Sequence, residues 1–497
     1  MKHCKKTLAA LLAMAMALMW VLSGCSAGAP GGVMGSPGGN LNIAPTVGGD
    51  SYTEIVENAF VSTSEENKSY FSIDANTASY PNLRRLIKDG YAIDKDAVRV
   101  EEILNYFHYD YETPINGDIL SLNASLFDTP YNSETKLLTI GLAAQEVEFT
   151  QVRNNLVFLI DTSGSMFGSD RLGLVQQAFM MLAENLNPED RISIVTYAGS
   201  DTIALEGAYG YEKQKIMAVI EDLQASGSTA GSKGIETAYR LAERYFIEGG
   251  NNRVILATDG DFNVGISNTD ALKQFISTKR DSGVYFSVFG VGVGNLQAEK
   301  MEALALNGNG VYSYLDSVEE ARRALVEQLG GTMITVAKDV KAGVIFDAEY
   351  VESFRLIGYE NKLLTQEEFE DSQKDAGELG SGHTVTVVYE IKLKEGALDA
   401  QRPLAQVELR YKAPDATADA ESLQLLMDIT AQDYHATMTQ QDAFIASVVE
   451  FALLLRNSEY KQDASLDALI ARLDDLDLSQ DCFKEEFRTL VKTYAKR

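Results

Sequence analysis

Between residues 154 and 329 the chain alternates short, almost purely apolar runs with stretches in which apolar residues recur every three or four positions. Such apolar runs are typical of strands buried on both faces of a sheet, and the stretches between them are typical of amphipathic helices. Because helical connections make the strands parallel, we predict an α/β domain of the Rossmann-like, three-layer kind with a mainly parallel central sheet. The predicted strands are Asn155–Ile160, Ile192–Tyr197, Val254–Thr258, Tyr285–Val291 and Val311–Leu315.

Oxygen-bearing side chains gather where three of these segments end or begin. Asp161, Ser163 and Ser165 directly follow the first strand, Thr229 lies in a Gly-rich segment that opens a helix, and Asp259 ends the third strand. Ligands bind at the carboxyl ends of strands in open α/β sheets, and an all-oxygen donor set suits Mg²⁺, with Mn²⁺ or Ca²⁺ as alternatives, rather than zinc. Asp-x-Ser-x-Ser alone is also common in ordinary turns, so the prediction of a metal site depends on all three segments.

These positions resemble the metal-ion-dependent adhesion site of a von Willebrand factor type A (vWA) domain. The five positions of that motif match Asp161, Ser163, Ser165, Thr229 and Asp259. The wider chain is similar to bacterial lipoproteins of the YfbK-like group, which place such a domain between two segments of their own. The segments that carry this likeness are Phe71–Tyr80, Ile255–Gly265 and Leu356–Asn361.

The resemblance implies roles for these side chains. Ser163, Ser165 and often Thr229 would contact the ion, while Asp161 and Asp259 would act partly through water. One coordination position would stay open for a carboxylate of a partner protein, which is the chemistry of adhesion. Asn76 stands where we expect Asp in the group, so the resemblance supports no ion or charge role for the segment around it.

The first residues predict export and lipidation. In residues 1–24, three lysines precede an apolar stretch from Leu8 to Leu22, and the sequence Leu-Ser-Gly leads into Cys25, as in lipoprotein signal peptides. The alternative is an uncleaved membrane helix, but the stretch is shorter than the roughly 20 residues that a span needs. Residues 25–50 then carry the lipidated Cys25 and a flexible tether rich in Gly, Pro and Ser. We therefore expect a protein that is lipid-anchored to a cell membrane on its extracytoplasmic face.

The net charge limits the classes of binding partner, and the cysteine content limits how the fold can be stabilised. The formal net charge of −29 repels nucleic acid and anionic lipid, so we expect no nucleic-acid partner and membrane contact through the lipid anchor only. Of the three cysteines, Cys4 would leave with the signal peptide and Cys25 would carry lipid, so Cys482 would remain alone. No internal disulfide is then possible in the mature chain, and its fold must depend on its core.

Two flanking regions are predicted around the central domain, which we place at residues 151–330. Residues 51–150 form an N-terminal, von Willebrand-associated segment of small α+β type, with a strand at Tyr70–Asp74 and helices at Tyr80–Asp89 and Asp96–Phe107.

The C-terminal flank divides in two. Residues 331–420 contain runs of alternating apolar and polar residues, which predict antiparallel strands in a β-sandwich-like region. Residues 421–497 predict a helical region. The apolar stripe of its first helix indicates core packing, with a groove for a partner as the alternative, and consists of Phe444, Val448, Phe451 and Leu455.

Catalysis by the metal would need an activated water beside a base, or a second metal ion about 4 Å away. The four histidines, His3, His108, His383 and His435, all lie outside the central domain, so no Ser-His-Asp triad can form within it. Asp261 is the spare carboxylate near the site, where it could orient the ligands or cap the next helix.

We therefore predict a protein that is not an enzyme and that binds an Asp or Glu of a protein partner through Mg²⁺. The alternatives are a metal-dependent hydrolase and a structural envelope protein whose ion only holds loops together.

Overall fold

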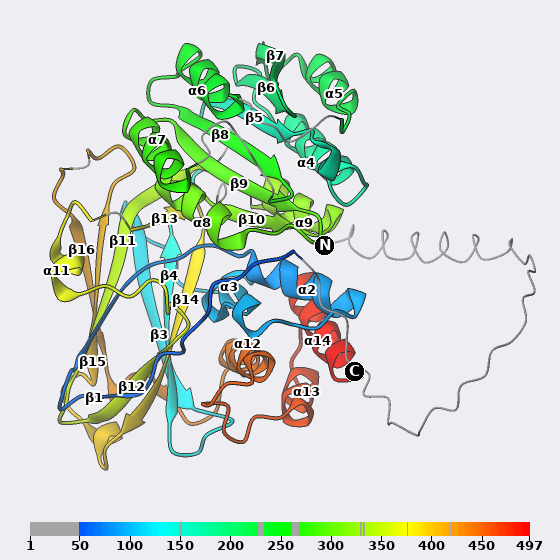
Figure 1. Ribbon diagram of the computed structural model, residues 1–497. Coiled ribbons are helices and arrows are strands. Elements are labelled where there is room, and N and C mark those ends of the chain that lie inside the picture. Colours follow the sequence, from blue (N-terminus) through cyan, green and yellow to red (C-terminus); the bar gives the residue numbers. More distant parts are fainter. Residues whose placement is uncertain are drawn as a thin grey trace, which may run out of the picture.

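The computed structural model describes residues 49–148, 152–226, 233–260, 268–328, 331, 333–374, 376–417 and 419–497. In Figure 1 the central domain (green) lies at one end of a β-rich body, and its edge strand β10 (Tyr312–Leu315) faces helix α2 (Ser79–Asp89) of the N-terminal segment. Within the described residues, no helix is both long and apolar enough to cross a membrane.

The central domain is built on a six-stranded sheet in the order β10-β9-β8-β5-β6-β7. All neighbouring strands are parallel except β6 and β7, which are antiparallel. The prediction of a mainly parallel sheet is thus confirmed, and β7 is the strand that the sequence patterns missed. The strands are β5 (Asn154–Asp161), β6 (Arg191–Tyr197), β7 (Asp201–Tyr209), β8 (Asn251–Thr258), β9 (Tyr285–Val291) and β10 (Tyr312–Leu315).

Helices cover both faces of this sheet. Alternate side chains of β5 enter different cores: Phe158 packs on the face of α4 and α5, and Val157 packs on the face of α6, α7 and α8. This division follows from the two-residue period of a strand and gives the three layers that the sequence predicts. The helices are α4 (Leu172–Glu184), α5 (Lys213–Glu221), α6 (Gly234–Arg244), α7 (Thr269–Asp281), α8 (Ala298–Asn307) and α9 (Val318–Arg322), followed by a π-helix at Arg323–Glu327.

The two flanking regions build a β-sandwich together. Strand β4 before the central domain pairs with β14 after it, and β2 pairs in the same way with β11. A β-rich C-terminal region was predicted, whereas the sharing of strands between the two flanks was not. One sheet contains β1 (Val61–Ser62), β12 (Val351–Ile357), β14 (Thr384–Leu393), β4 (Lys136–Ala144), β3 (Leu120–Asp128) and β17 (Tyr434–His435). The other contains β13 (Gly377–Gly380), β11 (Thr335–Phe346), β15 (Ala405–Lys412), β16 (Leu423–Ile429) and β2 (Lys68–Ser72).

Helices from both flanks form a separate aromatic core beside the sandwich. The apolar stripe on α12 is buried in this core, as core packing predicts. The helices are α2 (Ser79–Asp89), α3 (Val100–Asn105), α12 (Gln440–Arg456), α13 (Leu466–Asp474) and α14 (Cys482–Tyr494). Shorter helical turns lie at Lys95–Ala97, Gly164–Met166, Gln366–Glu370, Ala397–Asp399 and Ala431–Asp433.

The single helix predicted at Asp96–Phe107 is wrong. The chain forms a 3₁₀ turn at Lys95–Ala97 and then a helix only from Val100 to Asn105, because Val98 and Arg99 are extended. The hydroxyl of Ser79 holds this break: it donates to the Ala97 carbonyl and accepts from the Arg99 amide. The break directs the Arg99 side chain toward Glu102 and Glu302.

Candidate metal-binding site

The first loop of the site leaves the carboxyl end of β5 as the sequence predicts. Asp161 is fully buried at the end of the strand, and one of its oxygens accepts a 2.9 Å hydrogen bond from the Ser163 amide. The chain then turns through the 3₁₀ turn at Gly164–Met166, which places the hydroxyls of Ser163 and Ser165 2.9 Å apart. The loop thereby collects one carboxylate and two hydroxyls at the edge of the sheet.

The neighbouring strands hold the second oxygen of Asp161. It accepts hydrogen bonds of 3.2 Å each from the Thr258 hydroxyl at the end of β8 and from the Tyr197 hydroxyl at the end of β6. Burial, with a contribution from the nearby Asp259 carboxylate, raises the pKa of Asp161 to about 6. A cation would stabilise the charged form of Asp161, which burial and the neighbouring carboxylate disfavour.

Arg171 is a member of this site that sequence reasoning missed. Its guanidinium lies 3.5 Å from the carboxylate of Asp259, which is almost fully buried. The same group donates to the Ser165 carbonyl and, at 2.6 Å, to the Val293 carbonyl. Arg171 therefore joins the loops that follow β5, β8 and β9.

Sequence signals for these additional residues differ. Tyr197 and Thr258 end predicted strands adjacent to β5, so their position at the edge of the sheet could have been inferred. Arg171 precedes α4 and Asn295 lies in the loop after β9, where the Asn295 side-chain amide is 3.4 Å from Asp259. Neither position is marked by a local pattern, because the contact depends on how distant loops meet.

The described residues fit a divalent cation. Only oxygen atoms are supplied by Asp161, Ser163, Ser165 and Asp259, and oxygen is the ligand atom that such an ion prefers. The guanidinium of Arg171, a positive charge of the protein itself, lies beside Asp259. Of the other predicted site residues, Thr229, Asp261 and Cys25 lie outside the described residues. Their parts in binding or lipidation therefore stay predictions.

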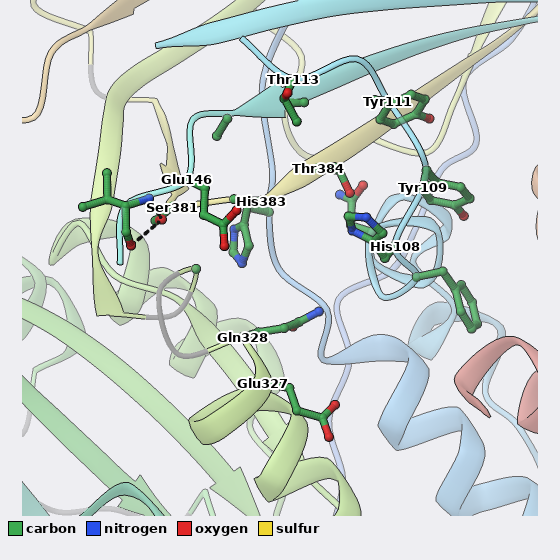
Figure 2. Close-up of a pocket in the computed structure, with 18 of the residues that line it drawn as sticks. His108, Tyr109, Tyr111, Thr113, Glu146, Glu327, Gln328, Ser381, His383 and Thr384 are labelled. Atoms are coloured by element: carbon green, nitrogen blue, oxygen red, sulfur yellow. Dashed lines mark hydrogen bonds between the residues drawn. The ribbon is translucent and has the colours of Figure 1, made fainter. Parts of the chain in front are cut away.

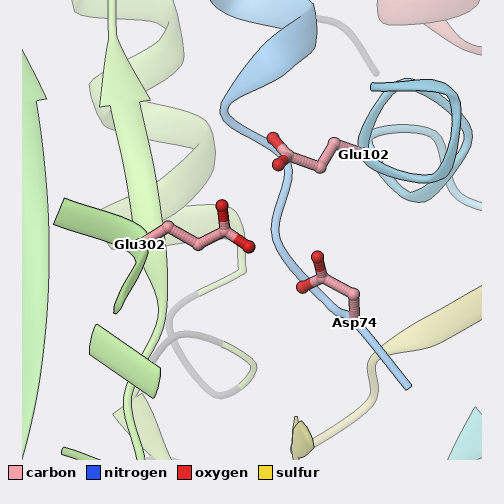
Figure 3. A group of neighbouring side chains, drawn as sticks. All are labelled: Asp74, Glu102 and Glu302. Atoms are coloured by element: carbon pink, nitrogen blue, oxygen red, sulfur yellow. The ribbon is translucent and has the colours of Figure 1, made fainter. Parts of the chain in front are cut away.

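A second group of carboxylates lies where the central domain meets both flanks. Figure 3 shows Asp74, Glu102 and Glu302 directed toward one another. One carboxylate oxygen of each lies within 4.8 Å of the others. Cations of the protein are already there: Lys362 lies 2.7 Å from Glu302 and 3.3 Å from Asp74. Burial, followed by the Glu302 charge, raises the pKa of Glu102 well above its usual range. We therefore interpret the group as an ion-paired junction between segments rather than as a metal site.

Asn76, where the YfbK-like group was expected to carry Asp, also lies at this junction. Its side-chain oxygen accepts a 3.2 Å hydrogen bond from the Tyr312 amide at the start of β10. The backbone amide of Asn76 donates a 3.0 Å hydrogen bond to the carboxylate of Asp74. Asn76 thus has a structural role between the N-terminal segment and the central sheet.

A separate cavity of about 810 Å³ lies between the central domain and the two flanks. Figure 2 shows Glu146 and His383 on one side of it and Glu327 and Gln328 on another. Burial, together with Arg323, lowers the pKa of His383 to about 4, so this imidazole is neutral at physiological pH. His108 is exposed on the cavity wall. Both histidines belong to the flanks.

Matches to known families agree with this description. The family model for the von Willebrand factor type A domain matches residues 155–328, and a second family model, described as von Willebrand factor, matches residues 46–139. The model for the C-terminal part of the uncharacterized protein YfbK matches residues 331–496. The chain is thus a vWA domain-containing protein, as its sequence indicates.

Relatives identify the family more closely. The chain is 36% identical over 438 residues to the uncharacterized protein YfbK of Escherichia coli (strain K12), a match that covers 83% of this chain and 75% of that protein. It therefore belongs to the YfbK family.

Other similarities are more distant. Inter-alpha-trypsin inhibitor heavy chain H3 of Bos taurus is 26% identical over 41% of this chain and 23% of its own length. A solved von Willebrand factor type A structure from Catenulispora acidiphila covers 78% of this chain and 91% of its own, with 13% identity and a TM-score of 0.42. The solved structure of the ArnB paralog VWA2 from Sulfolobus acidocaldarius covers 76% of this chain and 96% of its own, with 12% identity and a TM-score of 0.36.

Proposed function

We propose that the protein binds a partner protein through a Mg²⁺ ion at the edge of the central sheet, where an Asp or Glu of the partner completes the coordination. The observation that carries this proposal is the meeting of Asp161, Ser163, Ser165 and Asp259 at the carboxyl ends of β5 and β8. vWA domains commonly mediate metal-dependent contacts between proteins, which supports the same function.

The residues of the site would have different roles in binding the ion. Ser163 and Ser165 would bind the ion through neutral hydroxyls, Thr229 would add a third hydroxyl, and the two aspartates would balance the charge of the ion. When bound, the ion supplies an electrophilic centre for an incoming carboxylate. Thr258 and Tyr197 fix the orientation of Asp161, and Arg171 takes up part of the charge of Asp259. Because the two aspartates would act partly through water and the hydroxyls in contact with the ion are neutral, the ion would stay electrophilic enough to bind an external carboxylate.

We further propose that the function is binding rather than catalysis. A metal-dependent hydrolase needs a base beside the activated water, and histidine is the usual one. Both His108 and His383 belong to the flanks and line the separate cavity of Figure 2.

Location completes the proposal. Lipidation of Cys25 would anchor the chain to a membrane on the extracytoplasmic side, and residues 26–48 would connect the anchor to the folded part. The predicted tether ends too late at residue 50, because Asp50 is already hydrogen-bonded to the central domain. A Cys25→Ser variant expressed in cells should move from the membrane fraction to the soluble fraction. A variant that stays in the membrane fraction would contradict anchoring through this residue.

The metal site is tested by titrating Mg²⁺ or Mn²⁺ into the purified chain and measuring binding by calorimetry. Asp161→Ala, Ser163→Ala and Thr229→Ala should weaken binding by more than the roughly 10- to 100-fold that loss of an outer partner costs. Asp281→Ala is the matched control, since Asp281 is an exposed carboxylate at the end of α7, near the opposite edge of the sheet. Equal affinity in the wild type and in folded Asp161→Ala would refute the site.

The partner is tested by crosslinking on intact cells, comparing wild type with Ser163→Ala. Species captured by the wild type should be lost in the variant and after EDTA, and should return with Mg²⁺. Capture that is indifferent to both treatments would refute metal-dependent binding of a partner.

A further inference from the structure

The first described residues of the chain reach across to the central domain. The carboxylate of Asp50 accepts hydrogen bonds of 3.0 Å each from the backbone amides of Gly294 and Leu296. Its other oxygen is 3.0 Å from the guanidinium of Arg85 on α2, and the side chain of Asp50 is only 3% exposed. The next amide, that of Ser51, donates to the Leu296 carbonyl. Asp50 is therefore a buried link between α2 and one loop of the central domain.

That loop, residues 292–297, connects β9 to α8, and we call it the β9–α8 loop. Its opposite side forms part of the metal site. The Val293 carbonyl accepts from Arg171, and the side-chain amide of Asn295 lies 3.4 Å from Asp259. Gly260, which follows Asp259, packs so closely on the loop that a Cβ atom there would lie 2.2 Å from the Asn295 carbonyl oxygen. A displacement of the loop would thus move groups that touch both Arg171 and Asp259.

The sequence of the β9–α8 loop gives it little conformational preference of its own. Gly292 and Gly294 both have positive φ, at 75° and 94°. Glycine loses more conformational freedom on folding than any other residue, so a loop with two of them needs an external anchor. Asp50 accepts from two amides of this loop, and Gly49 leaves room for the approach, since a Cβ atom there would lie 1.9 Å from the Gly294 carbonyl oxygen.

We propose that Asp50 is a positioning residue for the metal site. By fixing the β9–α8 loop it holds Val293 and Asn295 against Arg171 and Asp259, and so sets the affinity of the site for a divalent cation. The proposal rests on the proposed function, because it assumes that the central domain binds the ion. The contacts lie between the N-terminal segment and the central domain, so the metal site depends on a residue outside the domain that carries it.

The experiment measures Mn²⁺ affinity in the full chain by titration, together with hydrogen exchange of the β9–α8 loop. Asp50→Ala should weaken Mn²⁺ binding by about tenfold, the lower end of what outer partners of metal ligands cost, and should speed exchange at Gly294 and Leu296. Asp50→Asn should restore most of the affinity, because its side-chain oxygen can still accept from the two amides. Glu54→Ala, at an exposed carboxylate of the same segment, is the control and should leave both readouts unchanged.

These variants distinguish the effect of the hydrogen bonds to the β9–α8 loop from the effect of the negative charge of Asp50. Removing a negative charge could weaken cation binding through space, but Asp50→Asn removes the same charge as Asp50→Ala, so rescue by the Asn variant points to the hydrogen bonds. If Asp50→Ala fails to fold, Asp50→Glu takes its place, since it keeps the charge while its longer side chain displaces the carboxylate from the two amides.

Unchanged Mn²⁺ affinity in folded Asp50→Ala or Asp50→Glu overturns the positioning role alone. Equal loss in the Ala and Asn variants overturns it too, because charge would then be the cause. A wild type that takes up no Mn²⁺ overturns the proposed function, and the positioning role with it.

Discussion

Lys362→Met should destabilise the protein strongly, because the Lys362 ammonium pairs with two carboxylates of the junction, those of Asp74 and Glu302. Figure 3 shows these carboxylates together with Glu102. The distances of 2.7 Å from Lys362 to Glu302 and 3.3 Å to Asp74 correspond to attractions of about 5 to 6 kcal/mol each at an effective dielectric constant of about 20. Desolvation of the three buried groups offsets most of this gain. Removing one partner of a buried pair leaves the other charge uncompensated and costs about 3–5 kcal/mol.

The loss of stability in the Lys362→Met variant should depend on pH. In the wild type, burial acts to raise the pKa of Glu302, but Lys362 and Arg99 outweigh it and hold that pKa below its usual value. Without Lys362, burial dominates and the folded-state pKa of Glu302 rises above that of the unfolded chain. The variant should then be least stable at high pH, where the folded state must hold the unpaired charge, and should regain stability as the pH falls and Glu302 binds a proton.

The assay is urea unfolding followed by circular dichroism at pH 5 and pH 8. Lys374→Met is the matched control, because Lys374 makes an ion pair of the same 2.7 Å length with Glu368, but both side chains are about 40% exposed. Such a pair contributes about 0–1 kcal/mol, so the control should unfold almost as the wild type does. A Lys362→Met variant within about 1 kcal/mol of wild type at pH 8, or one whose deficit is the same at both pH values, would refute the reasoning.

Two further predictions concern buried groups. Burial, followed by the charge of Glu360, raises the pKa of the fully buried Glu101 to about 7, so its contribution to stability is present below pH 4.5 and is lost as the pH rises through 7. Glu101→Gln should therefore be more stable than wild type above pH 7, by about 3 kcal/mol in denaturant unfolding, and an unchanged pH profile would contradict this. Phe158→Ala should cost about 3–5 kcal/mol, because Phe158 is fully buried in β5 and stacks on Phe179 of α4 at 4.2 Å. A loss below about 1 kcal/mol in the same unfolding experiment would mean that this core is not packed as described.

The central sheet was predictable because its strands are local patterns. Continuous apolar runs such as Tyr285–Val291 can be buried only between two layers of helices, and the structure has this strand with the same bounds. The edge strand β7 was missed, since several of its residues are exposed and its partner in the sheet is β6 alone. Its polar positions make it resemble a loop in sequence.

The candidate site was predictable in part for the same reason. Asp161 and Asp259 end two recognisable strands, and parallel neighbours must bring their carboxyl ends to one edge. Arg171 and Asp50 were not predictable, because the groups they contact in the site, Asp259 and the β9–α8 loop, lie far away in the sequence. The chain gives no periodic signal for such contacts.

The amino-acid sequence by itself determined which segments form strands and helices and which of them end in oxygen-bearing side chains, because these properties follow from neighbours within a few residues. The tertiary structure alone decided that strands from both flanks share two sheets, that Lys362 lies among three carboxylates, and that Asp50 reaches the loop beside the metal site. Each of these depends on segments that only the packing of the whole chain brings together.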